Sequence, residues 1–260
     1  MSYGQAMILG LIQGIAEFLP ISSSGHLYLA KYFFGIQDIP LAFDISLHLA
    51  TLVAVFIIFW RKIADLTMAA GRWCLRRSTP EDKPLLSMIF VIFFATFITG
   101  ILGLFIERIS VPVIVVAIGM LYTALLLILI PFLPAHKLWP SVAQIILLGL
   151  FQAIAVFPGI SRSGSTIFAA ILTGRQRSEA GEFSFILSIP IILAAFLFSL
   201  KDLGELHTST PMGPVLVSML CAFIAGLLSL RFLLRLISKA KLYYFSIYLI
   251  AVAIFVFVKI

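Results

Sequence analysis

Apolar residues run through this chain in long unbroken stretches rather than in the short alternating segments of a membrane β-barrel. A helix needs about 20 apolar residues to cross a bilayer. Six stretches meet this length or nearly so, and we expect each to be a spanning helix: 41–60, 85–106, 111–133, 182–200, 213–236 and 243–258. The pattern predicts an all-α polytopic integral membrane protein.

Two further apolar regions are interrupted by polar residues. Residues 4–35 contain LPISSSG at 19–25, and residues 142–174 contain PGISRSG at 158–164. Each half is too short to span the membrane. Proline and glycine open a helix, and serine hydroxyls can satisfy the backbone groups that are freed. We therefore expect two re-entrant hairpins of broken helix.

The two interruptions are copies of each other. LGLIQGIAEFLPISSSGHL at 9–27 aligns without gaps to LGLFQAIAVFPGISRSGST at 148–166, with eleven of nineteen positions identical. We expect a single membrane domain over 1–260, with one repeat at about 1–134 and a second at about 141–260. Three crossings per copy would turn the second copy upside down. This predicts an inverted-topology repeat, which places half-helix tips near the bilayer midplane.

Composition and charge agree with a membrane protein. Apolar residues make up 62% of the chain and charged residues 11%, against roughly 45–50% and about 25% in soluble domains. This excludes a cytosolic enzyme, a disordered chain and a secreted disulfide scaffold. The net charge of +7 reports orientation rather than nucleic-acid binding, since basic residues collect in cytoplasmic loops. The loop expected at 61–84 has six of them, which predicts that both termini are external.

The first break gathers groups that suit acid–base chemistry. Gln13 and Glu17 are four residues apart and share a helix face, and His26 follows the serine-rich turn. A carboxylate within an apolar run is costly and rarely idle. The alternative is structural: the serines satisfy Glu17, and His26 caps a helix.

The second break carries a cation. Arg162 is flanked by Ser161 and Ser163, with Thr166 one turn later. Backbone N–H groups at a half-helix N-terminus would point at the same anion that Arg162 could grip. The alternative is an internal ion pair between Arg162 and Glu17, which need not exclude a site.

Other polar residues leave alternatives open. Asp44 and His48 share a face of the stretch at 41–60, and they either line the site or pair with one another. Glu182 is expected to bind Arg175 or Arg177 at the membrane interface.

Together these groups predict a pocket for a phosphorylated lipid. Half-helix N-termini favour phosphate oxygens, and the tail of a lipid can stay in the bilayer. Glu17 would repel a phosphate unless a divalent cation bridges them or a proton is shared. Hydrolysis needs charge stabilisation, a nucleophile and a proton carrier, and all three are present.

GIAEFLPISSSGH at 14–26 and PGISRSGST at 158–166 resemble the two signature motifs of the undecaprenyl-diphosphatase family, known from bacitracin resistance. Length, hydropathy and the duplication agree along essentially the whole chain. The resemblance implies a phosphatase of the bacterial cytoplasmic (inner) membrane. It would hydrolyse undecaprenyl diphosphate to the monophosphate lipid carrier and inorganic phosphate, and so recycle the carrier for peptidoglycan synthesis.

The resemblance also implies roles for residues. Glu17 would be a catalytic carboxylate or a metal ligand, and His26 a proton carrier or nucleophile. Ser23 is the matching hydroxyl for attack; water bound to a metal is a further candidate nucleophile. The family's site opens to the outer face, and a divalent cation, Mg²⁺ or Ca²⁺, supports activity. The family's (Glu/Gln)-x-x-x-Glu element begins at Gln13 here, where one common form of the pattern has Glu. The pattern allows Gln, but a neutral amide is a poorer metal ligand.

Phosphate would be bound mainly by Arg162. The other expected phosphate-binding residues are polar neighbours in the two breaks: Gln13, Ser22, Ser24, Ser161, Ser163 and Thr166. The expected partners are the lipid substrate and membrane lipids, with no nucleic acid; a homodimer is left open. A different hypothesis is a polyprenyl-phosphate flippase or small-anion transporter, since transporters share inverted repeats. In a third hypothesis, the protein has no such site and the two polar breaks only pack against each other.

Overall fold

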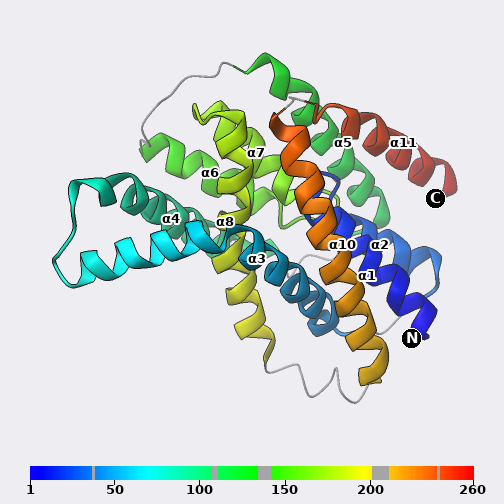
Figure 1. Cartoon of the computed structure of the whole chain (residues 1–260). Helices are drawn as coiled ribbons and strands as arrows, with labels where there is room; N and C mark the ends of the chain where they lie inside the picture. Colours follow the sequence, from blue (N-terminus) through cyan, green and yellow to red (C-terminus); the bar gives the residue numbers. More distant parts are fainter. Residues whose placement is uncertain (37–38, 107–110, 134–141, 201–210, 239–240) are drawn as a thin grey trace.

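The computed structural model describes residues 1–36, 39–106, 111–133, 142–200, 211–238 and 241–260, and this part of the chain contains helices and no strands. Figure 1 shows their arrangement. In chain order the helices are α1 (Tyr3–Phe18), α2 (Ser23–Phe33), α3 (Leu41–Cys74), η1 (Pro80–Asp82), α4 (Lys83–Ile106), α5 (Val113–Leu129), η2 (Ile130–Phe132), α6 (Val142–Ile154), α7 (Arg162–Leu172), α8 (Arg177–Ser199), α10 (Met212–Ser238) and α11 (Tyr244–Lys259).

The predicted polytopic helical fold is confirmed. In the described part of the chain, five helices are long and apolar enough to cross a membrane: α3, α4, α5 with η2, α8 and α10. The sixth predicted span is α11, which is apolar and has 16 residues. Both interrupted regions are broken as expected, into α1 with α2 and α6 with α7.

The prediction of a loop over 61–84 is wrong for most of its length. Helix α3 runs for 34 residues, with a kink at Phe59 (φ −107°, ψ 19°) close to the expected end of the span. At 1.5 Å per residue it is about 51 Å long, well beyond the hydrocarbon core of a bilayer. Charged residues stop a membrane span but not a helix. Two contacts hold the end of α3 against the start of α4. Arg72 Nε donates a hydrogen bond to the Asp82 carboxylate at 3.0 Å, and the Trp73 ring packs on the Phe90 ring.

Helix packing follows the duplication. α1 of the first copy packs along α10 of the second, and α6 of the second copy packs along α4 of the first. The helices α3 and α8, which hold the same place in the two copies, pack on each other, as do α5 and α11. Two copies related by a two-fold axis produce this reciprocal exchange. The inversion of the second copy across the membrane stays a prediction, as do the repeat boundaries. Two further basic residues, Lys137 and Lys239, lie outside the described residues.

Small residues fix the two broken helices in place. A Cβ at Gly14 of α1 would lie 2.4 Å from the Ala222 carbonyl oxygen of α10, so only glycine allows this approach. Ser229 of α10 also donates a hydrogen bond to the Gly14 carbonyl at 2.6 Å. In the second break, Gly159 has φ +95°, and a Cβ there would lie 2.1 Å from the Val116 carbonyl of α5. These contacts set the positions of the two polar turns.

Candidate active site

The two breaks lie against each other. A Cβ at Gly25 of the first break would meet the Gly159 Cα at 2.8 Å, and Ser163 Oγ donates to the Leu19 carbonyl at 3.4 Å. α2 and α7 both begin at this contact, capped by Ser22 and Ser161. The side chains of both caps accept a backbone N–H, from Gly25 at 3.2 Å and from Gly164 at 3.1 Å. The structure therefore brings two helix N-termini together, and these favour an anion.

Glu17 is the centre of the polar cluster. It comes from the last turn of α1, and its side chain is 3% exposed. Gln13 Nε2 donates to its Oε2 at 3.0 Å, and Ser23 Oγ donates to the same oxygen at 2.7 Å. The Arg162 guanidinium forms an ion pair with Oε1, and His48 Nε2 lies 3.3 Å from Oε2. Four different segments thus converge on one buried carboxylate.

The ion pair of Glu17 with Arg162, which the sequence offered as an alternative to anion binding, is present. This ion pair does not use all of the hydrogen-bond donors of the arginine. A guanidinium has five N–H donors, and within the described residues only its Nη2 is hydrogen-bonded, to Glu17. The Arg162 side chain is 23% exposed and lines a cavity. It is therefore able to bind an anion while Glu17 balances part of its charge.

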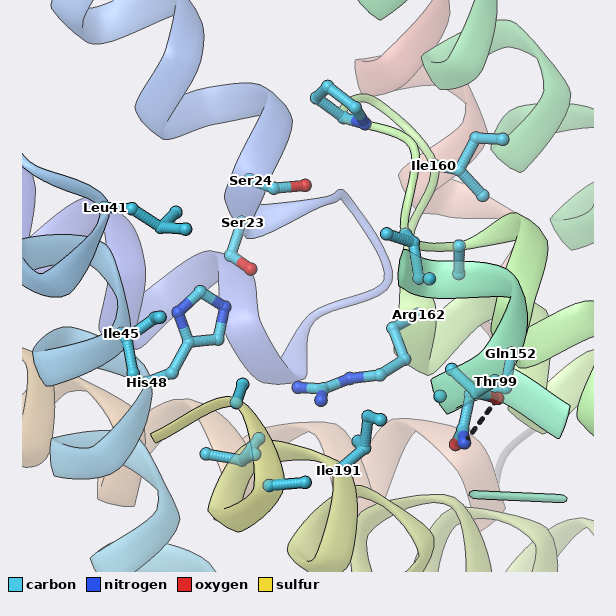
Figure 2. A pocket seen from close by; sticks show the side chains of 18 of the residues that line it. Ser23, Ser24, Leu41, Ile45, His48, Thr99, Gln152, Ile160, Arg162 and Ile191 are labelled. Atoms are coloured by element: carbon cyan, nitrogen blue, oxygen red, sulfur yellow. Dashed lines mark hydrogen bonds between the residues drawn. The ribbon is translucent and has the colours of Figure 1, made fainter. Parts of the chain in front are cut away.

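The cavity joins this polar cluster to an apolar wall. Its volume is about 900 Å³, and Figure 2 shows Arg162, His48 and Ser23 facing it from different helices. Glu17, Ser24 and Ser161 complete the polar end. The rest of the wall is mostly apolar and comes from α4, α8 and the turn that follows α6: Phe97, Ile101, Leu104, Val156, Ile191, Ile192, Ala195 and Phe198. A charged headgroup with an apolar tail matches this arrangement.

The structure does not bring every predicted phosphate-binding residue to the cavity. Gln13 is fully buried and not in the cavity wall, where it donates to Glu17. Ser22 caps α2, and Ser163 lines a smaller pocket beside Glu17. The Thr166 hydroxyl donates to the Arg162 carbonyl at 2.8 Å and contacts Ser184 at 2.5 Å. These four side chains support the site from outside the cavity.

The two histidines of the region differ in what they contact. His26 is not in the cavity wall: its Nδ1 lies 2.8 Å from the Ser22 carbonyl and its Nε2 2.7 Å from the Tyr248 hydroxyl of α11. His48 lines the cavity beside Glu17. Of the two readings left open for His48, lining the site is therefore the one observed. The only sequence signal was its place on one helix face with Asp44.

The acidic residues flanking the site are paired elsewhere. The Asp44 carboxylate binds Lys31 at 2.6 and 2.7 Å, and only the Asp44 backbone carbonyl faces the His48 ring. The predicted ion pair of Glu182 with Arg175 or Arg177 is wrong, because Glu182 lies 3.5 Å from Lys62. α8 packs on α3, and this puts Lys62, 120 residues earlier, closer than its sequence neighbours.

The donor set does not fit a metal ion held by the protein alone. No group of three His, Cys, Asp or Glu side chains with a suitable spacing occurs within the described ranges. Among the residues that the structure describes, Glu17 is the one carboxylate in the cavity wall, and it is already contacted by Arg162, Ser23, Gln13 and His48. Gln13 turns its N–H, not its oxygen, toward Glu17. The divalent cation stays a prediction.

Known proteins are similar to this chain over nearly its whole length. The family model described as bacitracin resistance protein BacA matches residues 6–255. A curated undecaprenyl-diphosphatase of Treponema denticola is 47% identical over 254 residues, covering 96% of this chain and 94% of that protein. One of Borrelia recurrentis is 40% identical over 261 residues, covering 97% of each. Undecaprenyl-diphosphatase 1 of Shouchella clausii is 37% identical over 273 residues, covering 99% and 96%.

Proposed function

The chain belongs to the bacitracin resistance protein BacA family, and on that premise we propose that it hydrolyses undecaprenyl diphosphate to undecaprenyl phosphate and inorganic phosphate. The observation that supports this most is the cavity itself. It joins a guanidinium and two helix N-termini to an apolar wall. A lipid diphosphate needs both ends: donors for its phosphate oxygens and apolar surface for its first isoprene units.

Arg162 binds the terminal phosphate in this proposal. Its side chain lines the cavity and keeps N–H donors that Glu17 does not use, and the N-terminus of α7 adds its dipole at the same place. Glu17 limits the cost of holding Arg162 at membrane depth before substrate arrives, because an unpaired buried cation is strongly unfavourable. The apolar side chains of α4 and α8 hold the beginning of the lipid tail.

Ser23 and Glu17 form a nucleophile–base pair. The Ser23 hydroxyl donates to Glu17 Oε2 at 2.7 Å, so the carboxylate is placed to take its proton as the oxygen attacks. If a water molecule attacks in place of Ser23, the same carboxylate takes the proton of that water. His26, also considered as a nucleophile, is outside the cavity wall. The geometry therefore favours Ser23 or water over His26.

His48, rather than His26, carries protons in this proposal. His26 Nδ1 faces a carbonyl oxygen, which only accepts, so Nδ1 bears the proton and Nε2 accepts from Tyr248. Both of its nitrogens are occupied. His48 Nδ1 also faces a carbonyl, that of Asp44 at 2.8 Å, but its Nε2 faces the Glu17 carboxylate. Because both residues line the cavity, His48 is placed to carry a proton between Glu17 and a bound substrate.

Cellular placement follows from the same proposal. The protein is an integral membrane protein. We infer that it lies in the bacterial cytoplasmic membrane with both termini and the cavity mouth on the outer face, since the α3–α4 hairpin is rich in Lys and Arg. A homodimer stays a prediction. Neither the described residues nor the comparisons favour the flippase or small-anion transporter.

Phosphate release in detergent tests the function, because no transport across a membrane is possible there. Purified protein is given undecaprenyl diphosphate with and without a chelator, and inorganic phosphate is measured. We expect release that depends on Arg162. Loss of release with chelator and its recovery with Mg²⁺ or Ca²⁺ would support the cation, while unchanged release would contradict it. Lipid movement in vesicles without phosphate release would contradict the enzyme and favour the carrier.

A further inference from the structure

Gln152 and Thr99 form a second polar pair in the cavity wall, apart from the cluster around Glu17. Gln152 lies on α6 and Thr99 on α4, and both side chains line the cavity. Figure 2 shows them together at the wall, joined by a hydrogen bond. Gln152 is 1% exposed and Thr99 2%. Polar groups buried this deeply normally have all their hydrogen bonds satisfied.

The orientation of the Gln152 amide follows from its partner. The Thr99 hydroxyl has one proton, which it donates to the carbonyls of Ala95 at 2.9 Å and Gly149 at 3.4 Å. Thr99 Oγ1 must therefore accept from Gln152 Nε2, which lies 3.0 Å away. The amide oxygen, Oε1, is then turned away from Thr99. It is buried and has no hydrogen-bond partner among the described residues.

The duplication gives Gln152 a counterpart in the first copy. Gln152 occupies the place of Gln13 in the second copy, and the place of Glu17 is taken by Val156. Gln13 donates to the carboxylate, whereas Gln152 has no carboxylate nearby in its own helix and donates to Thr99 instead. Gln13 Oε1 is unpaired as well, but Gln13 is not in the cavity wall. Of the two amides, Gln152 alone lines the cavity.

A buried acceptor on a side chain that lines the cavity needs a hydrogen-bond donor. An ionised diphosphate offers oxygen acceptors and no N–H, and apolar side chains such as Val156 and Ile191 line the same cavity. Water is a donor, and hydrolysis consumes one molecule of it. Resting on the proposed function, we propose that Gln152 positions the water that attacks phosphorus. Its Oε1 accepts one O–H of that water, and Thr99 holds the amide in the required orientation.

The step balances without a further reactant. A bond forms between the water oxygen and phosphorus, while the bond from phosphorus to its leaving oxygen breaks. That oxygen is the bridging oxygen of the lipid diphosphate, or Ser23 Oγ if a phosphoserine forms first. The leaving oxygen takes the electron pair. The second water proton passes to Glu17, whose side chain lines the same cavity.

The test compares water with an alcohol as the attacking group. Full-length purified protein in detergent is given a polyprenyl diphosphate labelled at its terminal phosphate, in buffer with added methanol. Inorganic phosphate, methyl phosphate, kcat and KM are measured for wild type, Gln152→Met, Thr99→Val and the matched control Thr99→Ser. We expect Gln152→Met to lower kcat roughly 10- to 100-fold with KM within about threefold of wild type. The ratio of methyl phosphate to phosphate should rise, because bulk methanol no longer competes with a held water.

Thr99→Val should also raise the ratio of methyl phosphate to inorganic phosphate. Thr99→Ser should behave like wild type, since serine keeps the hydroxyl that accepts from Gln152. If no variant uses methanol, the values of kcat test the proposal instead. They must be lower in Thr99→Val than in wild type, and they must not be lower in Thr99→Ser. An unchanged product ratio with a lowered unfolding temperature would show that the Gln152–Thr99 pair only joins α4 to α6, and would overturn the proposal. A rise in KM alone would overturn it too. Absence of phosphate release by wild type would instead contradict the proposed function.

Discussion

Replacing Arg162 tests the site most directly, because this one side chain both binds phosphate in the proposal and pairs with Glu17. Arg162→Met removes the guanidinium and keeps an unbranched apolar stem of similar reach. It also leaves the Glu17 carboxylate buried, at 3% exposure, without its cation. Two losses are therefore expected, one in catalysis and one in folding, and they must be separated.

The catalytic loss is worked from the donors that Arg162 keeps free for phosphate. Removing one well-placed donor to a developing charge typically lowers kcat by about 10²- to 10³-fold. Since the guanidinium offers phosphate two parallel N–H groups, we expect kcat/KM to fall by roughly 10³-fold or more. The folding loss is that of breaking a buried pair, about 3–5 kcal/mol, reduced because Arg162 is 23% exposed.

The double variant Glu17→Gln with Arg162→Met is the control for folding. It removes both charges, so the unfolding temperature should recover toward wild type while phosphate release stays lost. Initial rates of phosphate release and thermal unfolding in the same detergent are the two measurements. Phosphate release by Arg162→Met within about fivefold of wild type, well short of the loss of a single donor, would refute the assignment of Arg162 to phosphate.

Three further variants examine the neighbouring groups. His48→Gln should lower kcat by roughly 10²-fold as a proton carrier is lost, whereas His26→Gln should mainly lower the unfolding temperature; the opposite pattern in a rate assay would restore His26 to the site. Ser23→Ala should lower kcat by orders of magnitude if serine is the nucleophile, and a phosphoserine trapped by rapid acid quench should be absent from it; wild-type rates in Ser23→Ala would leave water as the attacking group. Gly14→Val should destabilise the protein by about 1–3 kcal/mol or more, because its side chain would meet the Ala222 carbonyl; unchanged thermal unfolding would contradict the close contact of α1 with α10.

The sequence by itself determined the membrane class, the interrupted segments and the charged groups of the site. Long apolar runs identify helices because a bilayer demands that every backbone group be bonded within the segment. Glu17 and Arg162 stand out for a related reason, since each is a costly charge in an apolar surrounding. Both signals are local: they depend on a residue and its neighbours along the chain.

Only the tertiary structure decided which side chains meet. Both His26 and His48 are polar residues beside a break or on its neighbouring helix, yet His26 meets Tyr248 of α11 and His48 meets Glu17. Lys62 reaches Glu182 because α3 continues as a helix beyond its kink. Gln152 has its free oxygen because Thr99 of α4 lies beside it. Such contacts depend on how helices far apart in the chain cross, and the periodicity of one helix carries no information about the crossing.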